Sequence, residues 1–204
     1  MGESRRRLTL VAVAALAVGV LLGFGVGWLV PRLTAPGDDS AEAGFARDMS
    51  SHHAQAVEMA LLAYRNGENP GVRQLGYDIA TVQQAQIGVM QTWLRDWGLS
   101  PTGSRPRMAW MPDGQQSLEN GLMPGMATPQ QLEQLRNAKG RDFDVLFCQL
   151  MLRHHLGGIH MVDGVLSETS DGEVRGLAEG MKAGQTKEVK ILQDLLTDLN
   201  AKPL

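Results

Sequence analysis

Residues 49–53 read MSSHH and residues 151–155 read MLRHH, so the chain carries one pattern twice, 102 positions apart (His154 minus His52). All five histidines lie in these two segments or, for His160, shortly after the second one. On a helix the methionine and the second histidine of each pattern share one face, because they are four positions apart. Thioether sulfur and imidazole nitrogen are donors for transition metals, so the repeated pattern indicates a metal site.

The repeat extends beyond the two motifs without a gap. The residue pairs that match at the offset of 102 are Val57 and Ile159, Met59 and Met161, Val72 and Val174, Arg73 and Arg175, Leu75 and Leu177, Gln83 and Gln185, Ile87 and Val189, and Leu94 and Leu196. Apolar residues recur at three- and four-residue steps, as in amphipathic helices, and no segment alternates like a strand. The sequence therefore predicts an all-α protein in which two duplicated helical hairpins form a four-helix bundle.

Turn and capping residues divide the predicted bundle, which covers residues 41–200. The predicted segments are a first hairpin at about 41–97, a crossover at 98–140 and a second hairpin at about 141–200. Asn69 and Pro70 are an N-cap and a first-turn residue for the second helix. Ser170 or Asp171 caps the last helix. Within the crossover, Thr128 opens a short helix with a capping box, and that helix is expected to end at Gly140.

The N-terminus predicts a membrane segment. Residues 8–30 are uncharged and follow three arginines, Arg5 to Arg7. Such a run can cross the roughly 30 Å hydrocarbon core as a helix, and preceding cations keep its start in the cytoplasm. We therefore expect a cytoplasmic segment at 1–7, an anchor at 8–30, a linker at 31–40 and the remainder outside the cytoplasm, in a single-pass protein of a bacterial cell membrane.

A cleavable signal peptide is the alternative for this segment. Ala41-Glu42-Ala43 could serve as its cleavage site, and cleavage would give a secreted protein. The apolar region of a signal peptide is usually only about 7–15 residues long. A retained anchor therefore agrees better with the length of the run.

Charge and cysteine content exclude several functions. Leaving out Arg5 to Arg7, Arg32 and Glu3 removes four of the 19 basic and one of the 22 acidic residues, so the exported part has 15 and 21, a net charge of −6. An acidic domain is poorly suited to nucleic acid, which is bound by neutralising phosphates. The single Cys148 excludes an internal disulfide. No Glu-x-x-His pair, zinc-protease, haem-attachment or nucleophile motif occurs, so we assign no catalytic residue.

Helical geometry predicts which polar residues face the histidines. If the first turn centres near residue 68, His53 comes level with Gln83, and Met49 comes level with Gln86. The same count in the second hairpin pairs His155 with Gln185, and Met151 with Glu188. Buried polar groups need partners, and ligating histidines commonly have their second ring nitrogen held by such groups. A hydrogen-bond network that only fixes helix register is the alternative.

Several further sulfur and nitrogen donors are ambiguous. Cys148 shares the face of Met151 and His155, so it can join that cluster or simply pack in the core. His160 replaces Glu58 of the first repeat and points away from His154, which leaves it either exposed or coordinating. The methionines of the crossover either cover the end of the bundle or capture a soft ion; these are Met108, Met111, Met123 and Met126.

The two motif segments, with MPGMAT at 123–128, resemble the bacterial family called domain of unknown function 305, over about residues 41–199. The family is similar in fold to ferritin-like four-helix bundles, and some members are linked to copper binding or copper tolerance outside the cytoplasm. The resemblance implies six candidate ligands: Met49, His52, His53, Met151, His154 and His155. Cys148 departs from the aliphatic residue usual in the family.

The leading hypothesis is therefore an extracytoplasmic metal-binding bundle that sequesters or transfers copper. Thioether and imidazole donors favour Cu(I), and zinc is the nearest alternative ion. The partner expected for such a protein is a metallochaperone or another envelope protein. The second hypothesis is a structural or interaction module whose histidine layer only specifies packing. The third is an oxidoreductase with a metal or haem held in the bundle.

Overall fold

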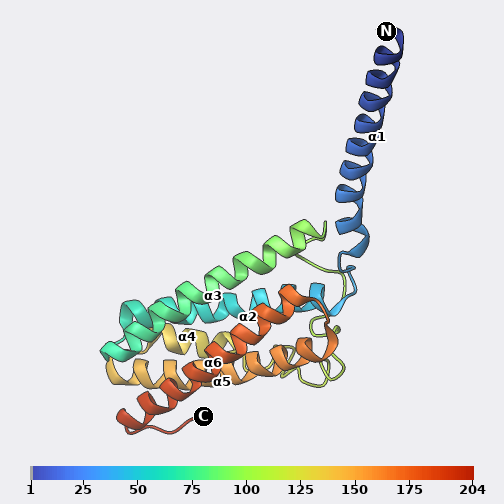
Figure 1. The fold of residues 1–204 in the computed structure, drawn as a ribbon. Coiled ribbons are helices and arrows are strands. Elements are labelled where there is room, and N and C mark those ends of the chain that lie inside the picture. The colour runs from blue at the N-terminus through green and yellow to red at the C-terminus, as the bar shows by residue number, and fades with distance from the viewer. Residues whose placement is uncertain (1) are drawn as a thin grey trace. The chain divides into compact units, whose positions relative to one another are not determined.

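The computed structural model describes residues 2–204, with side chains omitted for Ser4 and residues 25–34. Over the described residues the chain forms six helices and no strand (Figure 1). They are α1 (Gly2–Thr34), α2 (Ala41–Asn66), α3 (Pro70–Asp96), α4 (Pro129–Asn137), α5 (Gly140–Glu168) and α6 (Gly172–Asp198). The chain divides into two compact units, one up to Pro36 and one from Gly37 to Leu204. The predicted all-α class is confirmed.

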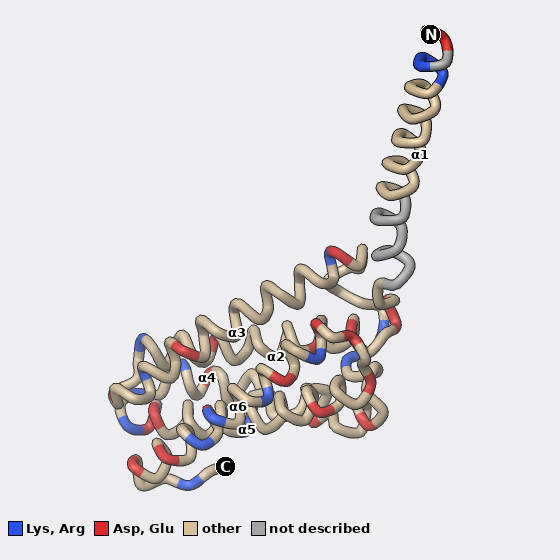
Figure 2. Tube along the Cα trace, in the orientation of Figure 1, with Lys and Arg blue, Asp and Glu red and all other residues tan. Residues whose placement is uncertain are grey.

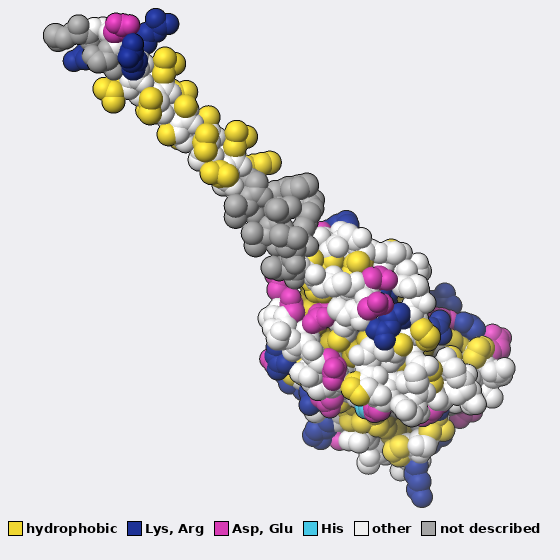
Figure 3. Space-filling view, turned by 90° about the vertical axis from the view of Figure 1, so that its right-hand side faces the viewer, with side chains coloured by type: hydrophobic (Ala, Val, Ile, Leu, Met, Phe, Trp, Pro, Cys, Tyr) yellow, Lys and Arg dark blue, Asp and Glu magenta, His cyan; other side chains and the backbone are white. Residues whose placement is uncertain are grey.

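The first unit consists mainly of α1. Its stretch Arg5–Phe24 is long and apolar enough to cross a membrane. Apolar side chains cover the described surface of this helix (Figure 3), and basic residues gather at its start (Figure 2). The expected linker at 31–40 is shorter in the structure, because α1 continues to Thr34 despite Pro31 and leaves residues 35–40 as the connection. The side chains of the last part of the predicted span, residues 25–30, lie outside the described set.

The second unit is the predicted four-helix bundle. Helices α2 and α3 form the first hairpin, and α5 and α6 form the second (Figure 1). Helices α2 and α5 pack against each other in antiparallel directions, whereas α3 and α6 meet only weakly. The motif-bearing helices are therefore the two inner ones. This arrangement relates the hairpins by an approximate twofold axis between α2 and α5.

Local capping explains where the helices begin. Ser40 accepts a hydrogen bond from a backbone N–H of the first turn of α2, and Asn69 does the same for α3, in which Pro70 is the first residue. Asp171, one of the two expected caps, accepts from two backbone N–H groups at the start of α6. Such caps satisfy the free N–H groups of a first helical turn.

The crossover helix begins as predicted and ends early. Thr128 and Gln131 form the expected capping box of α4. The helix ends at Asn137 and not at Gly140. Gly140 has a φ of +55° and lies at the start of α5. Its conformational freedom therefore serves the turn into α5 and not the end of α4.

The two hairpins hold each other's turns. The buried carboxylate of Asp144, near the start of α5, accepts hydrogen bonds from the backbone N–H groups of Glu68 (3.0 Å) and Asn69 (2.7 Å) in the first turn. At the equivalent place near the start of α2, Glu42 accepts one from the hydroxyl of Thr169 in the second turn. Each inner helix thus binds the turn of the other hairpin through a carboxylate near its start.

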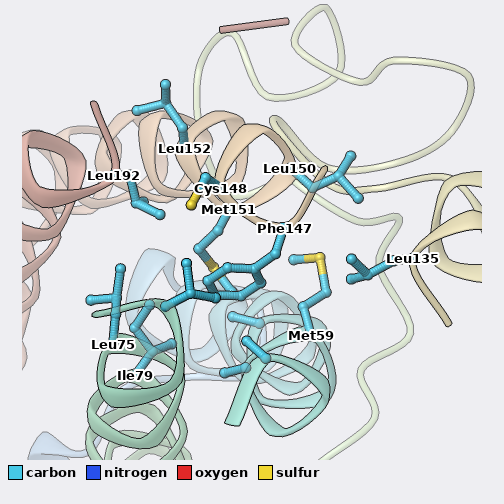
Figure 4. Close-up of a cluster of buried hydrophobic side chains, with 14 of the residues drawn as sticks. Met59, Leu75, Ile79, Leu135, Phe147, Cys148, Leu150, Met151, Leu152 and Leu192 are labelled. Carbon is cyan, nitrogen blue, oxygen red and sulfur yellow. The ribbon is translucent and has the colours of Figure 1, made fainter. Parts of the chain in front are cut away.

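The core consists of two apolar clusters. The Phe147 cluster contains, among others, Ala56, Met59, Leu75, Ile79, Phe143, Phe147, Cys148, Leu150, Met151 and Leu192 (Figure 4). The Trp110 cluster contains, among others, Phe45, Met49, Ile87, Met90, Met108, Trp110, Met111, Met123, Met161 and Met181. Along both α2 and α5, the motif histidines lie between the residues of one cluster and those of the other. The histidines therefore form a polar layer within an apolar core.

The crossover closes one end of the bundle. Buried Asp48 of α2 accepts hydrogen bonds from the backbone N–H of Met108 (2.7 Å) and from the indole N–H of Trp110 (2.8 Å). Met108, Met111 and Met123 are buried in the Trp110 cluster. The crossover methionines therefore help to cover the bundle end, and three of the four are buried there.

Candidate metal centre

The structure brings the two histidine pairs together. His52, His53, His154 and His155 are each at most 1% exposed. The rings of His52 and His154, which are equivalent in the repeat, lie against each other across the α2–α5 contact, with centroids 3.8 Å apart and planes tilted by 35°. The rings of His154 and His155 are 6.5 Å apart. Two motifs that are distant in sequence therefore form one buried cluster of four imidazoles.

The outer histidine of each motif is held by the second helix of its own hairpin. The Nε2–H of His53 donates to the Gln86 side-chain oxygen at 2.9 Å. The Nε2–H of His155 donates to the Glu188 carboxylate at 2.6 Å. Gln86 and Glu188 occupy equivalent positions of the repeat. The expected contacts between the histidine rings and polar residues of α3 and α6 are therefore present, with an amide in one half and a carboxylate in the other.

The register of this pairing differs from the expected one by three residues. Counting residues outward from the turn placed Gln83 opposite His53, whereas Gln86 makes the hydrogen bond to His53. Helical side chains lean toward the N-terminus of their own helix. In an antiparallel hairpin this lean carries His53 toward the level of Gln86, and carries Gln86 back toward His53. The second hairpin shows the same shift, from Gln185 to Glu188.

The two glutamines predicted to face the histidines, Gln83 and Gln185, are both buried. Gln83 is 3% exposed and Gln185 is 5% exposed. Gln185 packs against Gly158, where a Cβ atom would lie 2.4 Å from the side-chain oxygen of Gln185. Gly158 thus provides space for an amide beside the histidine layer. Neither Gln83 nor Gln185 makes a hydrogen bond to a histidine among the described residues.

The crossover backbone covers the inner histidines. The Nε2–H of His52 donates to the carbonyl of Pro124 at 3.0 Å. Gly125 has a φ of +75°, and a Cβ atom on it would meet the backbone of Arg153. A Cβ atom on Gly157 would lie 2.0 Å from the carbonyl oxygen of Pro124. Glycine at 125 and 157 therefore lets the loop backbone lie directly on α5.

Two polar side chains fix this loop. The Gln55 amide exchanges two hydrogen bonds with the backbone of Ala127, at 2.9 and 2.7 Å. Arg153 donates to the carbonyl of Met126 at 3.0 Å and to the Gln131 side chain at 2.9 Å. The sequence did not reveal Pro124, Gln55 or Arg153 as parts of the site. A backbone acceptor leaves no trace in residue type, although Gly125 and Gly157 signal a close approach.

Each of the four buried rings keeps one nitrogen without a hydrogen-bond partner among the described residues. These atoms are Nδ1 of His52, His53 and His155, and Nε2 of His154. Where Nε2–H donates, the neutral ring has its lone pair on Nδ1. Ligating histidines show this pattern, with one nitrogen fixed by an oxygen and the other free for the metal. The residues present thus fit a transition metal.

Burial keeps three of these rings, those of His52, His53 and His154, neutral at physiological pH. It lowers the pKa of His52 from the ordinary 6.5 to about 4, against the opposing effect of the Pro124 carbonyl. Burial, together with the neighbouring His52, lowers the pKa of His53 to about 3. Burial and the nearby histidines hold the pKa of His154 well below 6.5. Neutral imidazole is the form that binds metals.

The two motif methionines lie on opposite sides of the histidine layer. Met49 belongs to the Trp110 cluster and Met151 to the Phe147 cluster, and both are fully buried. This placement follows from the antiparallel direction of α2 and α5, since each methionine lies one turn before its own histidines. The described residues hold no group of three or more His, Cys, Asp and Glu arranged for a metal ion. A complete set of donors would therefore include thioether sulfur or need side chains to shift.

Cys148 and His160 have separate environments. Cys148 lies between Leu152, Leu192 and Met151 in the Phe147 cluster (Figure 4). Burial, and then the nearby Asp144, raises the pKa of its thiol to about 12. The metal-binding form is the thiolate, so this environment favours packing.

His160 lies outside the buried layer. Its side chain is 40% exposed, and its Nε2 is 3.5 Å from the Asp113 carboxylate. Of the candidate donors, the structure thus gathers the four motif histidines and leaves His160 apart.

Comparisons with known proteins agree with this architecture. The family model described as "Domain of unknown function (DUF305)" matches residues 42–196. A crystal structure of a DUF305 protein from Streptomyces coelicolor, provisionally described as secreted, is 41% identical, covers 82% of this chain and 99% of its own, and has a TM-score of 0.75. A DUF305 fragment from Deinococcus radiodurans is 26% identical, with coverage of 78% and 96% and a TM-score of 0.65.

A further similar structure contains copper. CopM in the Cu(II)-bound form is 26% identical, covers 78% of this chain and 97% of its own, and has a TM-score of 0.61. The Cu(I)-bound form of CopM aligns at 24% identity and supports the fold alone. No curated protein matches the chain in sequence.

Proposed function

This chain belongs to the DUF305 family, and we propose that it is an extracytoplasmic copper-binding protein that sequesters or transfers the ion through its paired Met-x-x-His-His motifs. One observation carries the proposal. Four buried imidazoles from two distant motifs converge, and each keeps one nitrogen without a partner among the described residues. An unpaired polar atom in a protein interior costs free energy. A bound ion would remove that cost.

The donor types support copper. The proposed ligands are drawn from Met49, His52, His53, Met151, His154 and His155. Neutral imidazole and thioether sulfur form a soft to borderline set, which favours Cu(I), with zinc as the nearest alternative. The similarity to Cu(II)-bound CopM supports copper among the transition metals. Bound copper would be held by these side chains under the cover of the Pro124 segment.

The N-terminal helix supports a location in the cell envelope. Its apolar stretch is long enough to serve as an anchor or a signal segment, and the similar Streptomyces coelicolor protein is provisionally described as secreted. We propose that α1 tethers the bundle to the bacterial membrane, with residues 1–7 in the cytoplasm and the bundle outside. An envelope protein or metallochaperone would then exchange copper with it.

A packing role is the second candidate, and one observation favours it. Three of the four rings already donate to oxygen, on Pro124, Gln86 and Glu188. Such a network can fix the register of a bundle without any ion. In this case the histidine layer would be a structural element of an interaction module.

Copper titration separates the two candidates. We expect the full chain in detergent to bind Cu(I) with submicromolar affinity, measured anaerobically by competition with a chromophoric chelator. Replacing all four motif histidines by glutamine keeps a polar layer and should abolish this binding. His160→Ala is the matched control and should leave the affinity unchanged.

The folded state of each variant is checked by circular dichroism. If the quadruple variant does not fold, the pair Met49→Leu and Met151→Leu, which preserves apolar volume, tests the thioether donors instead. Wild-type affinity in a folded quadruple variant would reject copper binding at this layer.

A further inference from the structure

The two halves of the histidine layer differ in charge at one pair of equivalent positions. Gln86 and Glu188 are separated by the repeat offset of 102, and each accepts a hydrogen bond from the outer histidine of its own hairpin. The donor–acceptor distance is 2.9 Å to the neutral amide and 2.6 Å to the carboxylate. Hydrogen bonds to an ionised acceptor are shorter and stronger than neutral ones. His155 therefore has an anionic partner that His53 lacks.

The charge difference acts close to the free ring nitrogens. His155 is fully buried, and the Glu188 side chain is only 18% exposed. A carboxylate that accepts from one nitrogen of an imidazole raises the basicity of the other nitrogen. A negative charge in a poorly hydrated site also interacts more strongly with a cation than it would in water. Both effects grow with the charge of the bound ion.

We propose that Glu188 is a positioning residue that, through His155, shifts the preference of the whole centre toward divalent copper, relative to the preference that a second neutral amide such as Gln86 would give. The inference rests on the proposed copper binding and adds the determinant of oxidation-state preference. Glu188 acts through His155, without contact to the ion. The repeat provides the comparison, because Gln83 and Gln185 are identical and Ile87 and Val189 are similar at equivalent positions, although Ala85 and Gly88 are matched by Lys187 and Lys190.

Reciprocal substitutions in the full chain test the proposal. Glu188→Gln should lower the Cu(II) affinity about 10- to 100-fold and lower the Cu(I) affinity much less. The Cu(II)/Cu(I) potential then rises by about 59 mV for each tenfold change in that ratio. Gln86→Glu should shift the potential in the opposite direction. The double variant that exchanges the two residues should return to a value near that of the wild type.

A second measurement uses the metal-free protein. The short bond to Glu188 should place the Nε2–H proton of His155 far downfield in a proton NMR spectrum. Glu188→Gln should move this signal upfield and leave the His53 signal in place. A purely structural role for Glu188 would instead weaken Cu(I) and Cu(II) binding together, with no shift of the potential.

The outcomes distinguish this inference from the proposed function. A wild-type protein that binds no copper would overturn both. A wild type that binds copper, with a Glu188→Gln variant of unchanged potential, would overturn the inference and leave the proposed function intact. Opposite shifts in the two single variants, with recovery in the exchange variant, would support it.

Discussion

The two hairpins repeat the same donors, yet their surroundings differ. In the first hairpin, His52 is bonded to the Pro124 carbonyl, and the buried Asp48 holds the crossover. In the second, Leu150 stands where the first has Asp48, and His154 lacks a partner for its Nε2 among the described residues. The difference shows that the repeat fixes the positions of the donors, whereas the crossover, which exists only once, gives His52 a hydrogen-bond partner that the Nε2 of His154 lacks.

The largest expected effect tests whether the two apolar clusters contribute equally. Phe45 and Phe147 are equivalent in the repeat, and both are fully buried. Replacing either by alanine should lower the free energy of unfolding by about 3–5 kcal/mol, as measured by urea denaturation. Only Phe45 has an edge-to-face contact with Trp110, at 5.8 Å. Phe45→Ala should therefore also change the tryptophan fluorescence of the folded protein. A loss below about 1 kcal/mol in both variants would contradict the two-cluster core.

The next largest effect compares Asp144 and Glu42, the two carboxylates that accept hydrogen bonds from the turn of the opposite hairpin. Asp144 is buried and accepts two backbone hydrogen bonds, whereas Glu42 is half-buried and accepts one from a hydroxyl. Asp144→Ala should cost about 2–3 kcal/mol, because it removes two hydrogen bonds to a buried carboxylate and leaves two backbone N–H groups without that partner. Glu42→Ala should cost about 1 kcal/mol. Thermal unfolding of the two variants side by side measures the difference. Equal losses would show that burial at Asp144 adds nothing.

Acid should weaken the histidine layer of the metal-free protein. The pKa values of His52 and His53 in the folded protein, about 4 and about 3, lie below the ordinary 6.5. Between about pH 6.5 and 4 the unfolded chain therefore binds more protons. The free energy of unfolding should fall as the pH is lowered through this window, by about 1.4 kcal/mol per pH unit for each group. Urea denaturation at pH 7, 6 and 5 measures this slope, and the His52→Gln, His53→Gln double variant should give a shallower one. A flat profile in the wild type would contradict neutral burial.

The smallest effect is expected at His160, which lies outside the layer. Its exposed side chain and its distance of 3.5 Å from Asp113 indicate a weak surface contact. His160→Ala should change the free energy of unfolding by less than about 0.5 kcal/mol. Its copper affinity, measured in the same titration as the wild type, should be unchanged. A tenfold loss of affinity would place His160 among the ligands.

Much of the fold could be predicted because its signals are local. Asn69 and Pro70 mark a helix start through their own backbone preferences, and Thr128 does so through a capping box. The convergence of the histidines followed from the repeat, since two equal hairpins bury equal faces. The hydrogen-bond partner of each histidine was harder to predict. Side chains lean along each helix, so the partner of His53 is Gln86 and not Gln83.

The loop over the histidines could not be derived from the sequence. Pro124 acts through its carbonyl group, which every residue has, and Gln55 binds a backbone segment 72 positions away. Such contacts depend on the path of the crossover and leave no pattern of residue types. The surroundings of Cys148 could not be predicted for a similar reason. Its position on the same helix face as Met151 and His155 does not reveal whether its thiol contacts metal-binding side chains or leucines.

The single covalent connection between the hairpins has a consequence for how the centre can vary. Two identical subunits assembled around a twofold axis must carry any substitution on both sides at once. Here α2 and α5 belong to one polypeptide, so a glutamine at 86 can stand opposite a glutamate at 188. Because the crossover joins the two hairpins in one chain, the residues around the histidines of each hairpin can change independently. In a homodimer of a single hairpin they could not.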